Sequence, residues 1–110
     1  MTPLIVITGP TASGKTRRAV SLARAIGGEI ISADSRQVYR GMDIGTGKDM
    51  AEYGDIPVHL VDICPAGYKY NLYEYLRDYR AARADIEARG KVAVVCGGTG
   101  LYVESILRGL

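Results

Sequence analysis

A glycine-rich turn between two regular elements is the feature that most constrains this chain. The turn, GPTASGKT at residues 9–16, has the spacing Gly-x4-Gly-Lys-Thr of a phosphate-binding P-loop. An apolar run at residues 4–8 predicts a buried strand before it, and an amphipathic stretch at residues 17–26 predicts a helix after it. The motif requires a strand before it and a helix after it. The alternative is a glycine-rich turn that binds nothing.

The residue types in this turn suit a phosphate group. The glycines let backbone N–H groups point toward one place, and the N-terminus of the following helix adds partial positive charge. Lys15 adds a full positive charge, and the hydroxyl of Thr16 is a suitable Mg²⁺ ligand. The motif does not say which phosphate compound is bound. The predicted binding residues are Gly9, Pro10, Thr11, Ala12, Ser13, Gly14, Lys15 and Thr16.

Length and composition allow one folded domain. The 110 residues are 47% hydrophobic and 24% charged, an ordinary balance for a globular protein. The net charge of +2 neither requires nor excludes a nucleic-acid partner. The apolar runs are far shorter than a membrane span, and no signal-peptide pattern is present. Because Cys64 and Cys96 lack metal-site spacing, we expect reduced thiols in a cytoplasmic protein, the alternative being a disulfide in a secreted one.

The order of the predicted elements indicates an α/β fold. Further strands are expected at residues 29–32, 58–63 and 92–96, with a loop at 41–54. Asn71 is a predicted N-cap of a long helix that ends at Gly90, and a last helix is expected at residues 101–110. The tyrosines on the long helix have two interpretations, and core packing is favoured over a surface on which nucleic-acid bases stack. The predicted fold is P-loop NTPase-like, a doubly wound, mostly parallel sheet of about four strands.

Three separate segments should meet at one edge of this sheet. The P-loop, the segment that begins at Asp34 and the glycine-rich turn at residues 97–100 each follow a predicted strand. Ligands of such sheets bind beyond the carboxyl ends of the strands. Asp34 suits a general base or a metal ligand, and equally the cap of a turn. For Asp62 a strand-terminal cap is favoured over a metal carboxylate, and for His59 a structural role is favoured over a catalytic one.

Four blocks of sequence are informative together. They are GPTASGKT at residues 9–16, ISADSRQVYRGMDIGTGK at 31–48, HLVDI at 59–63 and GGTGLY at 97–102. In this order they resemble the tRNA dimethylallyltransferase family, also called tRNA isopentenyltransferase, over nearly the whole chain. Members of that family are much longer. We therefore expect residues 1–110 to form a single P-loop domain that is an incomplete fragment of a larger enzyme.

The resemblance implies transfer of a dimethylallyl group from dimethylallyl diphosphate to the exocyclic N6 of the adenine beside the tRNA anticodon. It implies that the P-loop binds the donor's diphosphate, that Thr16 helps to hold Mg²⁺, and that Asp34 is the general base. It also aligns Thr99 with a residue that lines the channel where the two substrates meet. The tRNA-contacting stretch of the family aligns with Asp34, Ser35, Arg36 and Gln37.

Other functions share some of these features. A P-loop is also typical of nucleotide-binding and ATP-binding proteins. The alternatives are an isopentenyltransferase acting on free AMP, ADP or ATP, a small P-loop kinase, and a non-catalytic nucleotide-binding module. The blocks at residues 34–39 and 97–102 argue against a kinase. The sequence does not indicate an oligomeric state.

Overall fold

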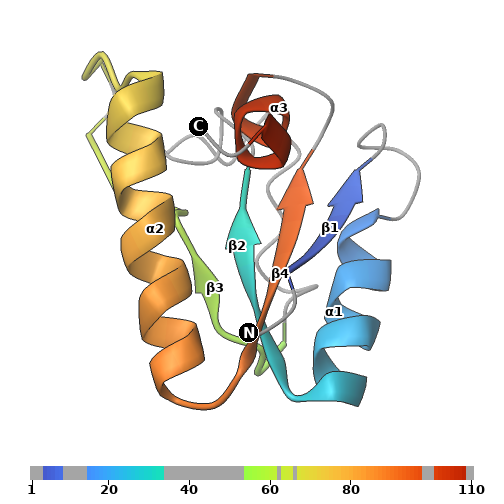
Figure 1. The fold of residues 1–110 in the computed structure, drawn as a ribbon. Coiled ribbons are helices and arrows are strands. Elements are labelled where there is room, and N and C mark those ends of the chain that lie inside the picture. The colour runs from blue at the N-terminus through green and yellow to red at the C-terminus, as the bar shows by residue number, and fades with distance from the viewer. Residues whose placement is uncertain are drawn as a thin grey trace.

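The computed structural model describes residues 4–8, 15–33, 54–61, 63–65, 67–97 and 101–108. Four strands in these ranges form one sheet in the order β1-β4-β2-β3, and every pairing is parallel. The strands are β1 (Leu4–Thr8), β2 (Gly28–Ser32), β3 (Val58–His59) and β4 (Val92–Gly97). The helices are α1 (Lys15–Ile26), α2 (Leu72–Ala88) and α3 (Leu101–Arg108). Figure 1 shows this arrangement, which confirms the predicted α/β fold with a parallel sheet of four strands.

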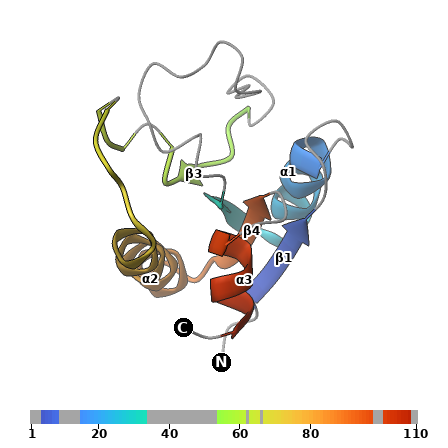
Figure 2. The same cartoon turned by 90° about the horizontal axis from the view of Figure 1, so that it is seen from above.

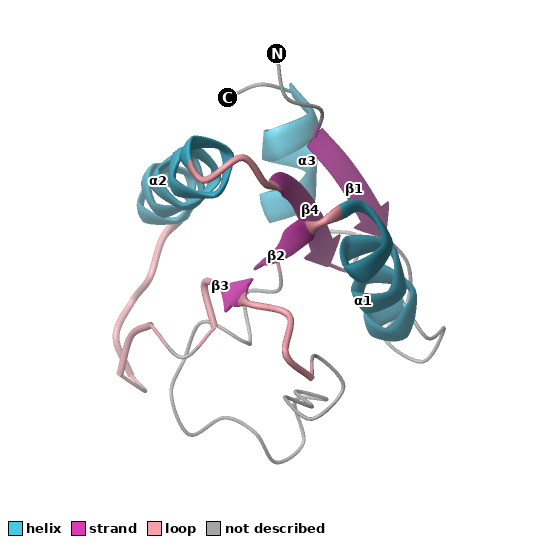
Figure 3. Cartoon of the chain, turned by 90° about the horizontal axis from the view of Figure 1, so that it is seen from below, coloured by secondary structure: helices cyan, strands magenta, loops and turns pink. Residues whose placement is uncertain are grey.

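The helices cover both faces of the sheet. Viewed from above and from below, α1 lies on one face and α2 and α3 lie on the other (Figures 2 and 3). Adjacent residues of a strand point to opposite faces, so Ile30 and Val94 pack with α1 while Ile31 and Val95 pack with α2 and α3. The continuous apolar run of β4 and the adjacent isoleucines Ile30 and Ile31 of β2 are therefore explained by burial on both sides.

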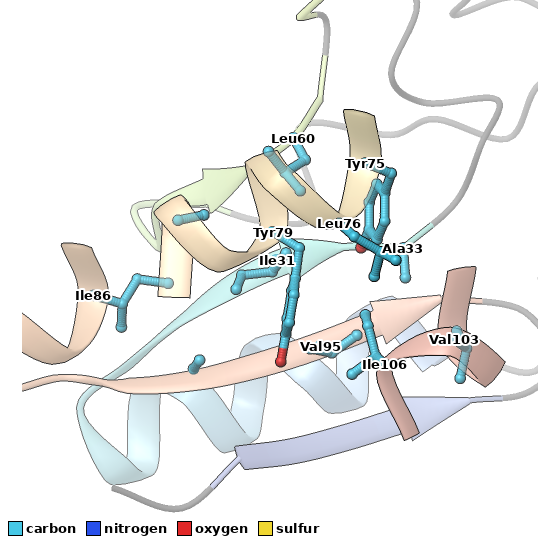
Figure 4. Packing of buried hydrophobic residues seen from close by; sticks show 12 residues of the cluster. Ile31, Ala33, Leu60, Tyr75, Leu76, Tyr79, Ile86, Val95, Val103 and Ile106 are labelled. Atoms are coloured by element: carbon cyan, nitrogen blue, oxygen red, sulfur yellow. The ribbon is translucent and has the colours of Figure 1, made fainter. Parts of the chain in front are cut away.

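Helix α2 begins and ends as the sequence predicts. The Oδ1 atom of Asn71 accepts from the Glu74 N–H at 2.8 Å, and Glu74 Oε1 accepts from the Asn71 N–H at 3.2 Å. These reciprocal bonds form a capping box. Gly90, with φ of 76°, follows the helix in the left-handed conformation that glycine tolerates. Tyr75 and Tyr79 are buried in the core (Figure 4), which confirms core packing for those two tyrosines.

The third predicted strand is wrong in its length. The pattern predicts residues 58–63, whereas β3 contains only Val58–His59. Leu60 has φ of 68°, a left-handed conformation that ends the extended backbone. Its side chain is 9% exposed and packs in the cluster under α2. The predicted loop at residues 41–54 and the candidate Asp62 lie outside the described residues, apart from Gly54, which is in a turn.

Two further expectations concern membranes and cysteines. Among the helices in the described part of the chain, none is both long enough and apolar enough to cross a bilayer. Cys64 and Cys96 are buried thiols and do not form a disulfide. This agrees with the expectation of two reduced cysteines, whose redox state stays a prediction.

Candidate functional site at the carboxyl edge of the sheet

Three strands end together at one edge of the sheet. In the parallel register, Thr8 of β1 lies beside Gly97 of β4, and Ser32 of β2 lies beside Cys96 of β4. The arrowheads of β1, β4 and β2 point to the same end of the molecule in Figure 1. The three strands therefore end at this edge with Thr8, Ser32 and Gly97. The prediction that three distant segments start from one place is confirmed for the strand ends themselves.

Most of the predicted site residues lie outside the described residues. Lys15 and Thr16 form the first two positions of α1, and their side chains are not described. The structure thus brings together the strand ends and the helix start that adjoin the site, while the roles of the individual side chains stay predictions. The predicted residues outside the description are Gly9, Pro10, Thr11, Ala12, Ser13, Gly14, Asp34, Ser35, Arg36, Gln37 and Thr99.

The start of α1 is electrostatically suited to an anion. The helix begins at Lys15, within the predicted P-loop motif at residues 9–16, and its first turn contains no acidic residue. The first N–H groups of a helix lack partners within the helix, and its peptide dipoles place partial positive charge at this end. No carboxylate of the first turn offsets that charge. This end of α1 therefore matches the phosphate-binding prediction for the loop.

A close contact joins the ends of β2 and β4. The Ala33 N–H donates to the Cys96 carbonyl at 2.9 Å. A Cβ atom at Gly97 would lie 2.8 Å from the Cβ of Ala33 and 2.9 Å from its carbonyl oxygen. Any side chain at position 97 would therefore collide with the backbone that leads into Asp34. The first glycine of the 97–100 turn is required by this packing, a reason that the sequence alone did not reveal.

A buried tyrosine reaches the same strand end from α2. The hydroxyl of Tyr75 donates to the Ser32 carbonyl at 2.9 Å, and Tyr75 is fully buried. Burial raises the pKa of Tyr75, so the hydroxyl keeps its proton and remains a donor. Sequence reasoning missed this contact, because helical periodicity indicates burial but no partner. The available signal was the residue type, since a buried tyrosine hydroxyl usually has a hydrogen-bond partner.

A charged cluster, Glu29 with Arg89 and His59, lies toward the opposite edge. Glu29 is the second residue of β2 and is 3% exposed. Both of its carboxylate oxygens accept from the Arg89 guanidinium, and His59 Nε2 lies 2.8 Å from Glu29 Oε1. The bonds from Arg89, followed by the bond to His59, lower the pKa of Glu29 to about 2 despite its burial. This contact of His59 supports the structural role that the sequence favours.

A hollow of about 290 Å³ beside the first turns of α2 is a second place to look for a ligand. Its polar groups bond one another: Tyr68 donates to Glu74, and Tyr70 donates to Asp78 at 2.5 Å. Arg77 Nε donates to Asp78 at 3.0 Å. Because these side chains bond one another, their polar groups are already engaged within the protein. Among the described residues, no group of three or more His, Cys, Asp or Glu side chains could hold a metal ion.

Two family profiles cover the chain. The family described as IPP transferase matches residues 37–110, which is more than half of the sequence, and the one described as Isopentenyl transferase matches residues 2–53. The chain belongs to the IPP transferase family. Membership in this family confirms the resemblance predicted from the four sequence blocks.

Relatives in the IPP transferase family are similar over almost the whole chain. The tRNA dimethylallyltransferase 2 of Syntrophotalea carbinolica is 61% identical over 105 residues, covering 96% of this chain and 35% of the relative. The tRNA dimethylallyltransferase 1 of Geotalea daltonii is 60% identical over 106 residues, covering 96% and 34%. The chain therefore spans about a third of the length of these relatives.

Solved structures of the family have the same fold over this region. The tRNA isopentenylpyrophosphate transferase of Bacillus halodurans superposes with a TM-score of 0.94 at 40% identity, covering 100% of this chain and 37% of that one. A eukaryotic dimethylallyltransferase acting on tRNA gives a TM-score of 0.90 at 34% identity, covering 96% and 26%. These likenesses confirm the predicted P-loop-like α/β fold.

Proposed function

We propose that this chain is the donor-binding and base-containing part of a tRNA dimethylallyltransferase. The whole enzyme transfers a dimethylallyl group from dimethylallyl diphosphate to N6 of the adenine beside the anticodon. One observation supports this most: the carboxyl ends of β1, β2 and β4 lie together, and each leads directly into one of the family's sequence blocks. The high identity to relatives named tRNA dimethylallyltransferase supports tRNA, rather than a free nucleotide, as the acceptor.

The proposed chemistry is a substitution at an allylic carbon. The adenine N6 forms a bond to the first carbon of the dimethylallyl group while the bond from that carbon to the diphosphate oxygen breaks. The electron pair leaves with the diphosphate, and an N6 proton passes to the carboxylate of Asp34. An aromatic amine is a weak nucleophile, so a carboxylate that accepts its proton speeds the attack. Backbone N–H groups of the P-loop and Lys15 stabilise the negative charge that develops on the diphosphate.

The residues of the loop fit Mg²⁺ as the accompanying ion. Mg²⁺ is usually held by few protein oxygens together with substrate phosphates and water. The single hydroxyl of Thr16 in the first turn of α1, with no acidic residue in that turn, suits such a site better than an all-protein cage. When bound, Mg²⁺ would neutralise part of the charge on the leaving diphosphate.

The acceptor side is assigned to the segment after β2. An adenine must leave its stack to reach a buried reactive centre. An amide such as that of Gln37 can bond an adenine edge through two hydrogen bonds, and Arg36 suits a phosphate of the anticodon stem. Thr99, which follows β4, would line the channel between donor and acceptor. Two buried thiols fit a cytoplasmic enzyme.

An activity assay tests this proposal. The chain is joined to the remaining two thirds of the Geotalea daltonii relative, and the hybrid is given labelled dimethylallyl diphosphate with either unmodified tRNA or AMP. We expect transfer to tRNA and none to AMP. Asp34→Asn should lower the rate by about 10²–10⁴, the range for loss of a general base. The control Asp55→Asn removes an exposed carboxylate paired with Arg24 and should leave the rate unchanged. Transfer to AMP, or an Asp34→Asn variant at full rate, would contradict the proposal.

A further inference from the structure

We propose that Tyr75 is a positioning residue for the reaction, because its hydroxyl fixes the end of β2 from which Asp34 continues and its ring joins that end to α3. The inference rests on the proposed function, in which Asp34 takes the proton of the adenine amine. It concerns a residue of α2 that none of the predicted site motifs contains.

The first part of the argument is the hydrogen bond. Ser32 is the last residue of β2, and its carbonyl accepts the Tyr75 hydroxyl at 2.9 Å. The next residue, Ala33, donates its N–H to Cys96 of β4 at 2.9 Å. The backbone just before Asp34 is thus bonded to α2 and to β4. Figure 4 shows the ring of Tyr75 beside Ala33 at this end of the strand.

The second part is the ring. Tyr75 stacks on Tyr102 with the ring centroids 4.0 Å apart and the planes at 15°. Tyr102 is the second residue of α3, the helix that follows the turn containing Thr99. One side chain therefore touches the strand end before Asp34 and the helix after Thr99. A shift of Tyr75 would be transmitted to both segments.

The third part is the cost of the hydroxyl. Phenylalanine would fill the same core volume without a polar atom, and a buried hydroxyl is favourable only when it is bonded. Tyr79 lies one turn further along α2 and is 7% exposed. Its ring stacks on that of Tyr75, with the ring centroids 6.4 Å apart. Its hydroxyl accepts from Arg83 of the same helix at 3.3 Å. Tyr79→Phe is therefore a matched control, which removes a hydroxyl from the same cluster without releasing the end of β2.

The first experiment measures amide hydrogen exchange by NMR on the hybrid enzyme described above. In Tyr75→Phe, the amide of Ala33 should exchange about threefold to tenfold faster relative to that of Ile30 in the middle of β2, the equivalent of one hydrogen bond. In Tyr79→Phe that ratio should not change. An unchanged ratio in Tyr75→Phe would overturn the inference.

The second experiment uses the hybrid enzyme described above. Tyr75→Phe should lower kcat for tRNA prenylation by about threefold to tenfold and leave the KM for dimethylallyl diphosphate unchanged, because the donor loop is not touched. Tyr79→Phe should keep both constants. Equal losses of kcat in Tyr75→Phe and Tyr79→Phe would overturn this inference alone. An unchanged kcat in Tyr75→Phe, in a hybrid where Asp34→Asn is slow, would do the same. If Asp34→Asn keeps its full rate, Asp34 is not the general base of the proposed reaction, and this inference is wrong as well.

Discussion

Replacing Glu29 by glutamine should destabilise the fold by an amount set by its contacts with Arg89. The Glu29 side chain is 4% exposed, whereas that of Arg89 is 43% exposed. The pair joins β2 to the end of α2, and Arg89 also bonds Asp85, with its Nη2 3.1 Å from Asp85 Oδ2. Glutamine keeps the size of the side chain and removes the charge, so the change tests electrostatics with little effect on packing.

The magnitude lies between two limits. Breaking a fully buried ion pair costs about 3–5 kcal/mol, and breaking an exposed one costs about 0–1 kcal/mol. Because Arg89 is partly in water and keeps Asp85, the loss on Glu29→Gln should be about 2 kcal/mol. Asp55→Asn breaks the ion pair with Arg24. The side chains of Asp55 and Arg24 are 85% and 59% exposed, so this change should leave the stability unchanged.

The pH dependence distinguishes this electrostatic explanation from a packing effect. The bonds from Arg89 lower the pKa of Glu29 from 4.5 to about 2. A lowered carboxyl pKa stabilises the fold fully above the unfolded value of 4.5, and this stabilisation is lost as the pH falls toward 2. The free energy of unfolding in urea is measured for wild type and Glu29→Gln at pH 7 and at pH 3. The difference between the two proteins at pH 3 should be less than half of the difference at pH 7. A difference that is equal at the two pH values would refute the reasoning.

Three further predictions concern the carboxyl edge of the sheet, the P-loop and the chain as a whole. Gly97→Ala should cost about 1–3 kcal/mol of stability in urea, the range for overpacking, and adding Ala33→Gly should restore only part because the carbonyl of residue 33 remains 2.9 Å from the new Cβ. Lys15→Ala should weaken binding of a prenyl thiodiphosphate by about 2–3 kcal/mol in calorimetry. ATP should bind the wild type less tightly than this analogue. If Lys15→Ala binds the analogue as tightly as the wild type does, the loop is not part of the site. β1 is at the edge of the described sheet and Leu107 is 66% exposed, so the 110-residue chain alone should self-associate, as measured by light scattering. It should also fail to prenylate tRNA. A stable monomer that prenylates tRNA would contradict this prediction.

Elements whose causes are local in sequence were predictable. The capping box of α2 depends only on Asn71 and Glu74, three positions apart, and the helix end depends on Gly90. The core strand β4 follows from its continuous apolar run, because a strand buried on both faces has no polar alternation. The predicted and observed bounds of these elements agree within one or two residues, since neighbours in sequence determine them.

Features that depend on distant residues were not predictable. The apolar run after Val58 looks extended, but the left-handed Leu60 turns the chain toward the core under α2. The Tyr75 hydroxyl finds its acceptor 43 positions earlier in the sequence, and Glu29 finds Arg89 60 positions later. Such contacts arise only after the helices pack on the sheet. The sequence therefore indicates which residues are buried better than it indicates what a buried polar group bonds.

The position of β4 gives the candidate site an order that the sequence did not indicate. Chain order would place β1 and β2 side by side, yet β4 pairs with both of them and separates them. The segment that follows Gly97 therefore starts between the one that follows Thr8 and the one that follows Ser32. In the proposed reaction the first of these flanking segments binds the diphosphate and the second contains the base. Thr99 follows this central strand in the sequence, and the channel-lining role proposed for it agrees with the position of the end of β4 between those of β1 and β2. The sheet order thus offers a physical reason why the last of the four sequence blocks, far from the P-loop in the chain, would belong to the site that we propose.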